Sequence, residues 1–307
     1  MLNGIMSVLV IFMIMAVGAY FTWRKKWPES TNKVFSIAVV QIAAPALAIV
    51  GIENHFTPQL LQASLMNLLV IAGSVLLMHF IGKLLAGLMK LPRKKKAVFE
   101  TTFTLNNTMF IGLPIISIVF GSEGLPYLFT FYLVSIVTFW SLGAYTLSRA
   151  SDNAGSSFSV KNILSPGLIG VLIGCTLAGT GFHLPMILET SLTYLSDICV
   201  PLSLLVIGSN LASSFSGGFP RITVDMIMIM AGKFIIHPLI IWGAFTLFGV
   251  NGLPLDVFIM MAALPCHAQT AIMAEYYGLE AQYASNLVSL STIISLVTIP
   301  VYATILL

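Results

Sequence analysis

Charged residues are scarce in this chain, and this scarcity excludes an ordinary soluble protein. Only 8% of the 307 residues are charged, 58% are hydrophobic, and the mean hydropathy is +0.98. Soluble domains carry about 25% charged residues, and a folded surface needs polar cover to remain monomeric in water. The composition therefore predicts a protein embedded in a lipid bilayer. A net charge of only +3 gives no indication of nucleic-acid binding.

Cysteine patterns and common catalytic motifs are also missing. Cys175, Cys199 and Cys266 lie in apolar runs without a C-x-x-C pair, so neither a disulfide framework nor a metal site is predicted, and no cofactor is expected. The sequence contains no G-x-x-x-x-G-K-[ST], H-E-x-x-H or G-x-S-x-G motif. These absences argue against ATP hydrolysis and against an intramembrane enzyme.

Long apolar runs dominate what is present. A membrane-spanning helix needs about 20 mostly apolar residues, and the sequence predicts ten such helices joined by short connections. Their approximate ranges are 3–23, 33–52, 60–82, 97–120, 125–148, 162–181, 188–211, 223–248, 255–277 and 282–306. The first run is followed, not preceded, by basic residues (Arg24, Lys25 and Lys26), which indicates a transmembrane helix instead of a signal peptide.

Basic residues are confined to alternate connections. All fourteen Lys and Arg lie in or beside the odd-numbered loops, whereas Glu53, Glu123 and Asp256 belong to the others. Loops rich in Lys and Arg remain in the cytoplasm, so both termini are predicted to be extracellular in a multi-pass protein of the cytoplasmic membrane. Lys83, which follows the third run, and Lys233, which lies within the eighth, are expected to snorkel to the membrane surface.

The polar stretch near the middle divides the chain into two halves. We predict a first five-helix repeat at residues 1–149, a cytoplasmic connecting loop at 150–161 and a second repeat at 162–307. Because five is odd, the second repeat would be inverted relative to the first. Pro45 corresponds to Pro201, and Gly121 to Gly278, at an offset of 156 or 157 residues. The predicted fold class is an all-α membrane protein of ten transmembrane helices in two inverted repeats.

Two runs contain proline and polar residues near their middle, in corresponding places of the two halves. Proline interrupts helices, and a broken helix persists in lipid only where it is buried in protein or lines a cavity. Such paired breaks are a pointer to a transporter binding site. The substrate-binding candidates at these breaks are Asn106, Asn107, Thr108, Gly112, Pro114, Pro265, His267, Gln269 and Thr270.

The chemistry of these breaks suits an anion. Helix N-termini present free N–H groups and a partial positive charge, and neither run carries a basic residue near its middle, so helix ends and amides are expected to hold a carboxylate. Other interpretations remain open. A proline kink often only shapes packing, and an isolated Asn or Thr often hydrogen-bonds a neighbouring helix.

Ionisable residues within the apolar runs are functional candidates by default. Asp197 and His267 are the candidates for a coupling ion. Asp197 would bind a cation or would pair with a polar neighbour near the outer surface. His267 would be a proton site or a neutral hydrogen-bond donor. His237 precedes Pro238 and would cap a kink.

Residues Asn107-Thr108-Met109-Phe110-Ile111-Gly112-Leu113-Pro114 resemble the N-T-G-F-x-G-x-P signature of the auxin efflux carrier family. Met109 departs from the usual glycine. Leu264-Pro265 and Tyr277-Gly278 also resemble the end of that family, which includes bacterial malate and malonate permeases and is related to plant PIN carriers. The resemblance implies a scaffold domain, a transport domain in which the broken fourth and ninth helices cross at the membrane centre, and a homodimer formed through the scaffold.

We therefore predict a secondary transporter, and not an enzyme, that moves a small organic anion by alternating access. A dicarboxylate such as malate or malonate is the expected substrate by analogy with the family. A proton and a sodium ion are the two candidates for a co-substrate. An exporter of auxin-like monocarboxylates with the same fold is the alternative. A channel and a membrane sensor are less consistent with paired internal breaks and short loops.

Overall fold

The protein is helical throughout the part that the structure describes. This computed structural model describes residues 2–28, 30–55, 58–152, 165–214 and 221–307, and no β-strand occurs among them. Six helices are long and apolar enough to cross a membrane, at Thr31–Asn54, Leu65–Leu88, Ser122–Ala150, Met186–Ser213, Val224–Leu247 and Ala281–Leu306. Shorter apolar helices cover Leu9–Trp23, Thr108–Val119, Pro166–Thr180 and Leu253–Ala262. The predicted all-helical, multi-pass class is confirmed.

The first half of the chain alternates long helices with short irregular ones. Its elements are α1 (Leu2–Trp23), α2 (Thr31–Ala38), the π-helix η1 (Val39–Ala43), α3 (Ala44–His55), α4 (Pro58–Leu88), α5 (Arg93–Thr104), the π-helix η2 (Thr108–Gly112), α6 (Leu113–Val119), the 3-10 helix η3 (Ser122–Gly124), α7 (Leu125–Thr138), the π-helix η4 (Phe139–Gly143) and α8 (Ala144–Ala150). Residues 153–161 of the predicted connecting loop lie outside the described residues.

The described residues of the second half likewise form α-helices interrupted by a π-helix. They are α9 (Pro166–Thr180), α10 (Met186–Asp197), α11 (Cys199–Ser214), α12 (Val224–Ala231), the π-helix η7 (Gly232–Ile236), α13 (His237–Leu247), α14 (Leu253–Ala262), α15 (Gln269–Tyr276) and α16 (Ala281–Leu306). Helical backbone continues without interruption from α12 through η7 to α13, whereas non-helical residues separate α14 from α15.

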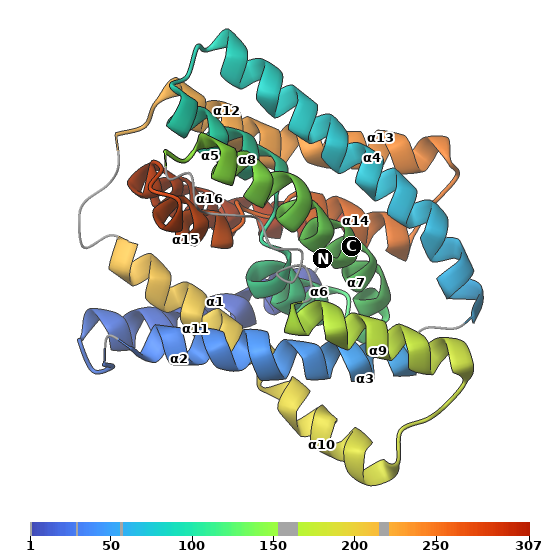
Figure 1. The fold of residues 1–307 in the computed structure, drawn as a ribbon. Coiled ribbons are helices and arrows are strands. Elements are labelled where there is room, and N and C mark those ends of the chain that lie inside the picture. The colour runs from blue at the N-terminus through green and yellow to red at the C-terminus, as the bar shows by residue number, and fades with distance from the viewer. Residues whose placement is uncertain (1, 29, 56–57, 153–164, 215–220) are drawn as a thin grey trace.

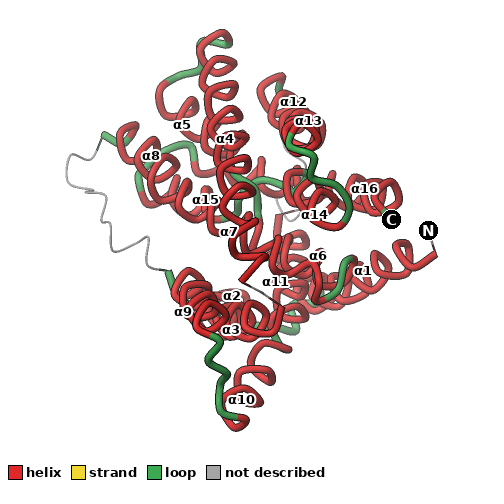
Figure 2. The backbone as a smooth tube through the Cα atoms, turned by 90° about the vertical axis from the view of Figure 1, so that its right-hand side faces the viewer, coloured by secondary structure: helices red, strands yellow, loops and turns green. Residues whose placement is uncertain are grey.

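The helices form two groups that face each other. Helices α1, α2, α3, α9, α10 and α11 lie together along the lower side of Figures 1 and 2, and α4, α5 and α12 to α16 lie above them. Helices α6 and α7 lie between the two groups, where α6 contacts α1 and α11 and α7 contacts both α3 and α14. The polar breaks described below belong to the upper group and to this boundary.

Glycines allow very close packing within the lower group. A Cβ atom at Gly208 of α11 would lie 1.9 Å from the Met15 carbonyl oxygen of α1, and one at Gly18 would lie 2.2 Å from the Leu205 carbonyl oxygen. No side chain fits in that space, so the backbones of α1 and α11 are in direct contact. Small residues at helix interfaces are the usual means of association in lipid, where tight packing replaces the hydrophobic effect.

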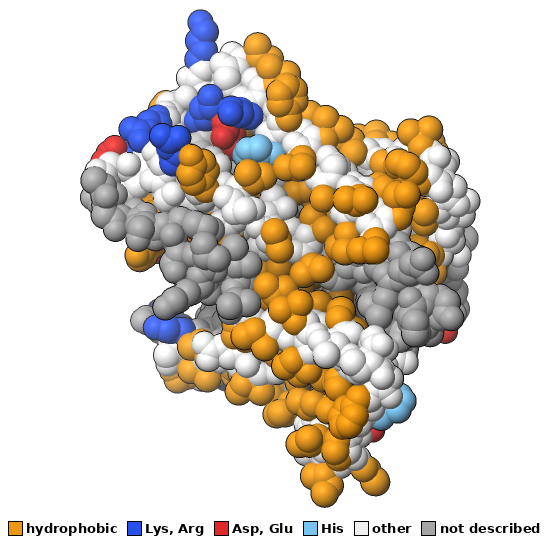
Figure 3. Space-filling view, turned by 45° about the vertical axis from the view of Figure 1, so that its right-hand side comes forward, with side chains coloured by type: hydrophobic (Ala, Val, Ile, Leu, Met, Phe, Trp, Pro, Cys, Tyr) orange, Lys and Arg blue, Asp and Glu red, His pale blue; other side chains and the backbone are white. Residues whose placement is uncertain are grey.

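Basic side chains gather at one end of the molecule. They lie toward the left of Figure 3, and hydrophobic side chains are spread over the rest of the described surface turned to the viewer. Lys95 Nζ lies 2.9 Å from Asp225 Oδ2, and the Tyr283 hydroxyl donates a hydrogen bond of 2.5 Å to the same oxygen. These contacts tie the starts of α5, α12 and α16 together. Nearby, the Lys94 ammonium hydrogen-bonds Asp152 and lowers the pKa of that carboxyl.

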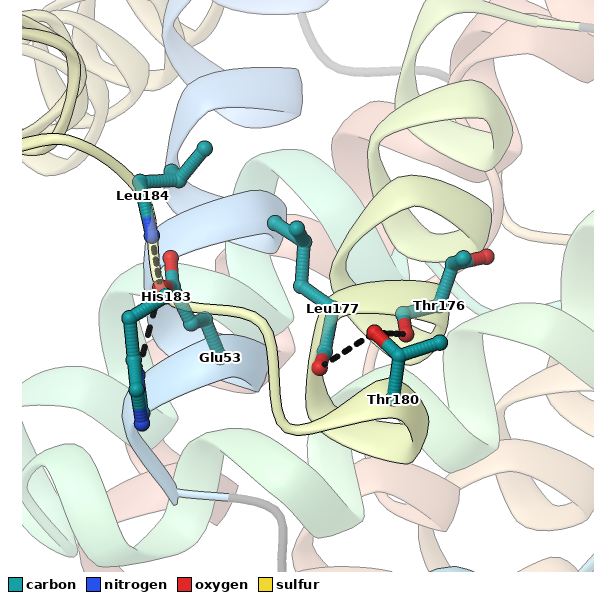
Figure 4. A network of polar contacts seen from close by, with 6 residues as sticks. All are labelled: Glu53, Thr176, Leu177, Thr180, His183 and Leu184. Carbon is teal, nitrogen blue, oxygen red and sulfur yellow. Dashed lines mark hydrogen bonds and ion pairs between the residues drawn. The ribbon is translucent and has the colours of Figure 1, made fainter.

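A carboxylate fixes the loop between α9 and α10. Glu53 Oε1, at the end of α3, accepts a hydrogen bond of 2.8 Å from the Leu184 N–H and lies 3.7 Å from His183 Nδ1 (Figure 4). The Glu53 side chain is 3% exposed and that of His183 is 85% exposed. The carboxylate therefore anchors this loop to the end of α3.

Candidate functional site

Two helices are interrupted where the sequence predicted breaks. Helix α5 ends at Thr104 and helical backbone resumes at Thr108, while α14 ends at Ala262 and helical backbone resumes at Gln269. The second break follows from Pro265, because proline has no N–H and disfavours helical backbone at the residue before it. Each break separates one helix C-terminus from one helix N-terminus.

The two breaks hydrogen-bond to each other. The Asn107 N–H donates to the Pro265 carbonyl oxygen at 2.9 Å, and the His267 N–H donates to the Leu105 carbonyl oxygen at 3.2 Å. Asn106 and Cys266 form an isolated antiparallel bridge between these bonds. Backbone groups that lose helical partners therefore find new ones in the opposite break, as a low-polarity environment requires.

The Asn106 side chain closes the C-terminus of α14. Its Nδ2 donates to the carbonyl oxygens of Met261 and Ala262, both at 2.8 Å. These carbonyls lack helical partners, because residue 265 is a proline and the Cys266 N–H donates to a serine side chain of α16 at 3.0 Å. Asn106 was predicted to bind substrate, but its N–H groups are engaged within the protein.

Lys233 reaches the same place from a third segment. It lies in η7 and is 0% exposed. Its Nζ donates to the Leu105 carbonyl oxygen at 2.6 Å and to Asn106 Oδ1 at 2.5 Å. The group also lies at the C-terminus of α5, the negative end of that helix dipole. The prediction that Lys233 snorkels to the membrane surface is wrong, because these oxygen acceptors hold it inside.

Local sequence explains how Lys233 reaches the break. Pro238 cannot donate to the Phe234 carbonyl one turn earlier, and this carbonyl instead accepts a hydrogen bond of 2.6 Å from the Tyr302 hydroxyl. The backbone widens into a π-helix at this point, a feature frequent at functional sites. At Gly232, a Cβ atom would lie 2.4 Å from the Phe103 ring, so the absence of a side chain lets η7 approach α5 closely.

The two helix N-termini have no side-chain caps. Asn107 precedes η2 and Ala268 precedes α15, and neither caps its helix through a side chain. Thr270 Oγ1 and His267 Nδ1 are buried without a hydrogen-bond partner among the described residues. Free N–H groups, a positive dipole end and unpaired polar side chains together can bind an anion.

The remaining predicted residues also lie at these breaks, with one exception. Thr108 begins η2 and Gln269 begins α15. Pro114 lies in the first turn of α6, and a Cβ atom at Gly112 would lie 2.7 Å from the Leu264 side chain, so Gly112 packs directly against the second break.

Asp197 is the exception, because it ends α10 and is exposed. Helix α10 packs mainly against α3, η1 and α11 in the lower group (Figure 1), and no recorded contact joins this carboxylate to the paired breaks among the described residues.

Sequence reasoning did not assign Lys233 and His237 to this site. His237 is 1% exposed, and its Nδ1 lies 3.4 Å from Asn106 Nδ2. The signal was available, since an ionisable residue inside an apolar run is a functional candidate. What the sequence did not show is that the helix carrying both residues packs against the break in the fourth predicted span.

A small cavity lies at the boundary between the two helix groups. Its volume is about 30 Å³, and its lining is mostly apolar, with Ile11 and Met15 on α1, Ile111 on η2 and Ile115 on α6 among the lining residues. A volume of this size holds about one or two water molecules. A dicarboxylate does not fit there unless the two groups move apart.

An all-helical membrane protein with two broken helices joined at a polar centre is typical of a membrane transporter. Comparison with known proteins agrees. The family model described as "Membrane transport protein" matches residues 3–303. The chain belongs to this family, the auxin efflux carrier family that the motif at residues 107–114 resembles. The family consists of transporters and not of enzymes.

Three relatives illustrate this membership. An uncharacterized transporter of Methanothermobacter thermautotrophicus is 30% identical over 201 residues, which is 65% of each chain and so slightly less than two thirds of that relative. An uncharacterized transporter of Methanocaldococcus jannaschii is 24% identical over 306 residues, 98% of each chain. A protein of Rhizobium meliloti, provisionally named a malonate transporter, is 24% identical over 135 residues, 44% of this chain and 41% of the relative.

Proposed function

We propose that this protein is a secondary transporter that carries a small organic anion across the cytoplasmic membrane by alternating access. One observation carries the proposal. At the paired breaks, Asn106 and Lys233 supply donors to the C-termini of α14 and α5, while the N-termini of η2 and α15 have no side-chain caps. The negative helix ends are satisfied internally, and the positive ends remain for an anionic ligand.

Within this proposal, the substrate contacts come from Asn107, Thr108, His267, Gln269 and Thr270. Asn107 and His267 hold equivalent places, because each donates its backbone N–H to the opposite break just before a half-helix begins. Gly112, Pro114 and Pro265 shape the backbone around them. Asn106 and Lys233 hold the frame and do not need to touch the substrate. His267 is the candidate proton site, and Asp197 remains a weaker candidate for an ion because of its exposed position.

The architecture that we propose has ten transmembrane helices in two inverted repeats, residues 1–149 and 162–307, with the broken helices crossing at the membrane centre. Helix packing supports this symmetry. Gly18 lies against the Leu205 carbonyl, and Gly174 lies against the Ala48 carbonyl at 2.9 Å from a Cβ position. These contacts correspond under the same offset, 156 or 157 residues, that relates Pro45 to Pro201. The distribution of basic residues supports extracellular termini.

The two helix groups suggest how access would alternate. The lower group is held rigidly by backbone contact between α1 and α11, which suits a scaffold. The broken helices belong to the other group and to the boundary, where α6 contacts α1 and α11, and they would move against the lower group. The small cavity at the boundary, lined by Ile11 and Ile111 from opposite sides, marks where the groups would separate to admit a substrate.

A dicarboxylate is the proposed substrate, with malonate first and malate second. The paired N-termini offer two positive ends to one ligand, which suits two carboxylates better than one. The provisional name of the Rhizobium meliloti relative also points to malonate. An auxin-like monocarboxylate is the alternative that the experiment must separate.

The test is uptake of labelled malonate, malate and indole-3-acetate into proteoliposomes that contain purified protein. We expect saturable uptake of a dicarboxylate that Asn107→Ala abolishes. Asn54→Ala, at an exposed position on α3, is the matched control and should transport normally. With an imposed pH gradient, His267→Gln should lose the response to the gradient if His267 carries the proton. Uptake of only the monocarboxylate would refute the dicarboxylate assignment, and no uptake of any anion by folded protein would refute the carrier proposal.

A further inference from the structure

Lys233 is a buried basic group whose recorded partners are oxygen atoms. The Leu105 carbonyl oxygen and Asn106 Oδ1 lie 2.6 and 2.5 Å from its Nζ. None of the described carboxylates forms an ion pair with it. Buried charges in proteins are normally paired with an opposite charge or coordinate a metal ion. Among the described residues, no acidic side chain at ion-pair distance balances the charge that Lys233 carries when it is protonated.

The oxygen atoms around Nζ are of the kind that bind simple cations. Carbonyl and amide oxygens are typical ligands of hard metal ions. The Leu105 carbonyl also ends α5, so its oxygen lies at the negative end of a helix dipole. The lysine is held in place by the fold, because η7 approaches α5 closely at Gly232 and Phe103. Because the ammonium group of Lys233 is covalently attached to the chain, it occupies this position without a cation binding from solution.

We propose that Lys233 is the built-in cation of this carrier. Its ammonium group fills an oxygen-lined position at the paired breaks that a free monovalent cation would otherwise fill, and its unbalanced charge is neutralised by the anionic substrate. Transport of the anion therefore does not require sodium. The transport part of this inference rests on the proposed function, whereas the cation position can be tested without any transport.

The first experiment measures thermal unfolding in detergent, in buffers with choline as the only other monovalent cation. Lys233→Ala removes the side chain beyond Cβ, and propylammonium has the size of the part removed. We expect this variant to unfold at a lower temperature than the wild type, and propylammonium to raise that temperature in a saturable manner. Lys233→Met fills the space without a charge and should not respond. Lys83→Ala, at an exposed lysine of α4, is the matched control.

The second experiment measures anion uptake into proteoliposomes. Wild-type uptake should be equal in sodium and in choline. Lys233→Ala should lose at least ten-fold in uptake and regain part of it with propylammonium or sodium, and Lys233→Met should lose as much and regain nothing. Lys233→Met tests the inference even if Lys233→Ala fails to fold.

Several results would overturn the inference. They are sodium-dependent uptake by the wild type, normal uptake by Lys233→Met, and an equal effect of propylammonium on the unfolding of the alanine and methionine variants. If the wild type transports no anion but propylammonium stabilises Lys233→Ala alone, the proposed function fails and the cation position stands.

Discussion

Replacing each of the two adjacent asparagines at the first break by alanine should affect different properties, stability for Asn106 and transport for Asn107. Asn106 donates to two carbonyl oxygens of α14, each at 2.8 Å, and accepts from Lys233 at 2.5 Å. For the Asn107 side chain, the structure records no hydrogen bond with any described residue, although its backbone N–H is bonded. Asn106→Ala should therefore lower the free energy of unfolding strongly. Asn107→Ala should reduce transport and leave the free energy of unfolding nearly unchanged.

The magnitude follows from the groups left without partners. Asn106→Ala leaves the buried carbonyls of Met261 and Ala262 unpaired and removes one of the two acceptors of Lys233. An unpaired buried polar group costs about 1–3 kcal/mol, and a hydrogen bond to a charged group contributes about 1.5–3 kcal/mol. The total is about 3.5–9 kcal/mol, a large part of the roughly 5–15 kcal/mol that stabilises a typical protein.

Thermal unfolding in detergent, followed by tryptophan fluorescence, measures the difference. At about 2 °C per kcal/mol, Asn106→Ala should lower the melting temperature by about 7 °C or more, and Asn107→Ala should change it by less than about 2 °C. Uptake measured on the folded fraction should be lost in Asn107→Ala. A melting temperature for Asn106→Ala within about 2 °C of the wild type would show that the α14 carbonyls do not depend on this side chain.

Two further predictions concern packing and the charged end of the molecule. Gly208→Ala should destabilise the protein by about 1–3 kcal/mol or more, because the new Cβ atom would lie 1.9 Å from the Met15 carbonyl oxygen; Gly73→Ala, with no atom within 4 Å of the added Cβ, should be neutral or stabilising in the same unfolding assay. Tyr283→Phe removes the hydrogen bond to Asp225 and should cost about 1.5–3 kcal/mol; a double-mutant cycle with Asp225→Asn measures this, and additive effects of the two changes would contradict it.

Local pattern in the sequence correctly predicted the membrane class and both helix breaks. Apolar runs of membrane length indicate helices because unpaired backbone groups are so costly in lipid. Pro265 and its polar neighbours marked the second break, because proline lacks the N–H that a continuous helix needs. Polar residues 106–108 marked the first break, whereas Pro114 lies within the helical run Thr108–Val119. These are properties of short segments, so the amino-acid sequence of a single segment is enough to recognise them.

The hydrogen-bond partners of the polar side chains at the breaks depended on the tertiary structure. Asn106 and Asn107 were both predicted to bind substrate, and only the fold shows that the Asn106 side chain hydrogen-bonds α14 while Asn107 precedes a helix N-terminus without a side-chain cap. Lys233 was expected at the membrane surface, because a long basic side chain near a helix end can reach water. In the fold, its Nζ instead donates to the Leu105 carbonyl oxygen and to Asn106 Oδ1 inside the protein.

The sequence by itself thus determined that the chain is helical, lies in a membrane and breaks two of its helices, since these follow from hydrophobic length, from Pro265 and from the polar residues 106–108. Only the tertiary structure decided that the two breaks hydrogen-bond to each other and that a lysine of a third segment hydrogen-bonds the first of them. The reason is that such contacts join residues more than a hundred positions apart, and the distance between them in space is set by how whole helices pack.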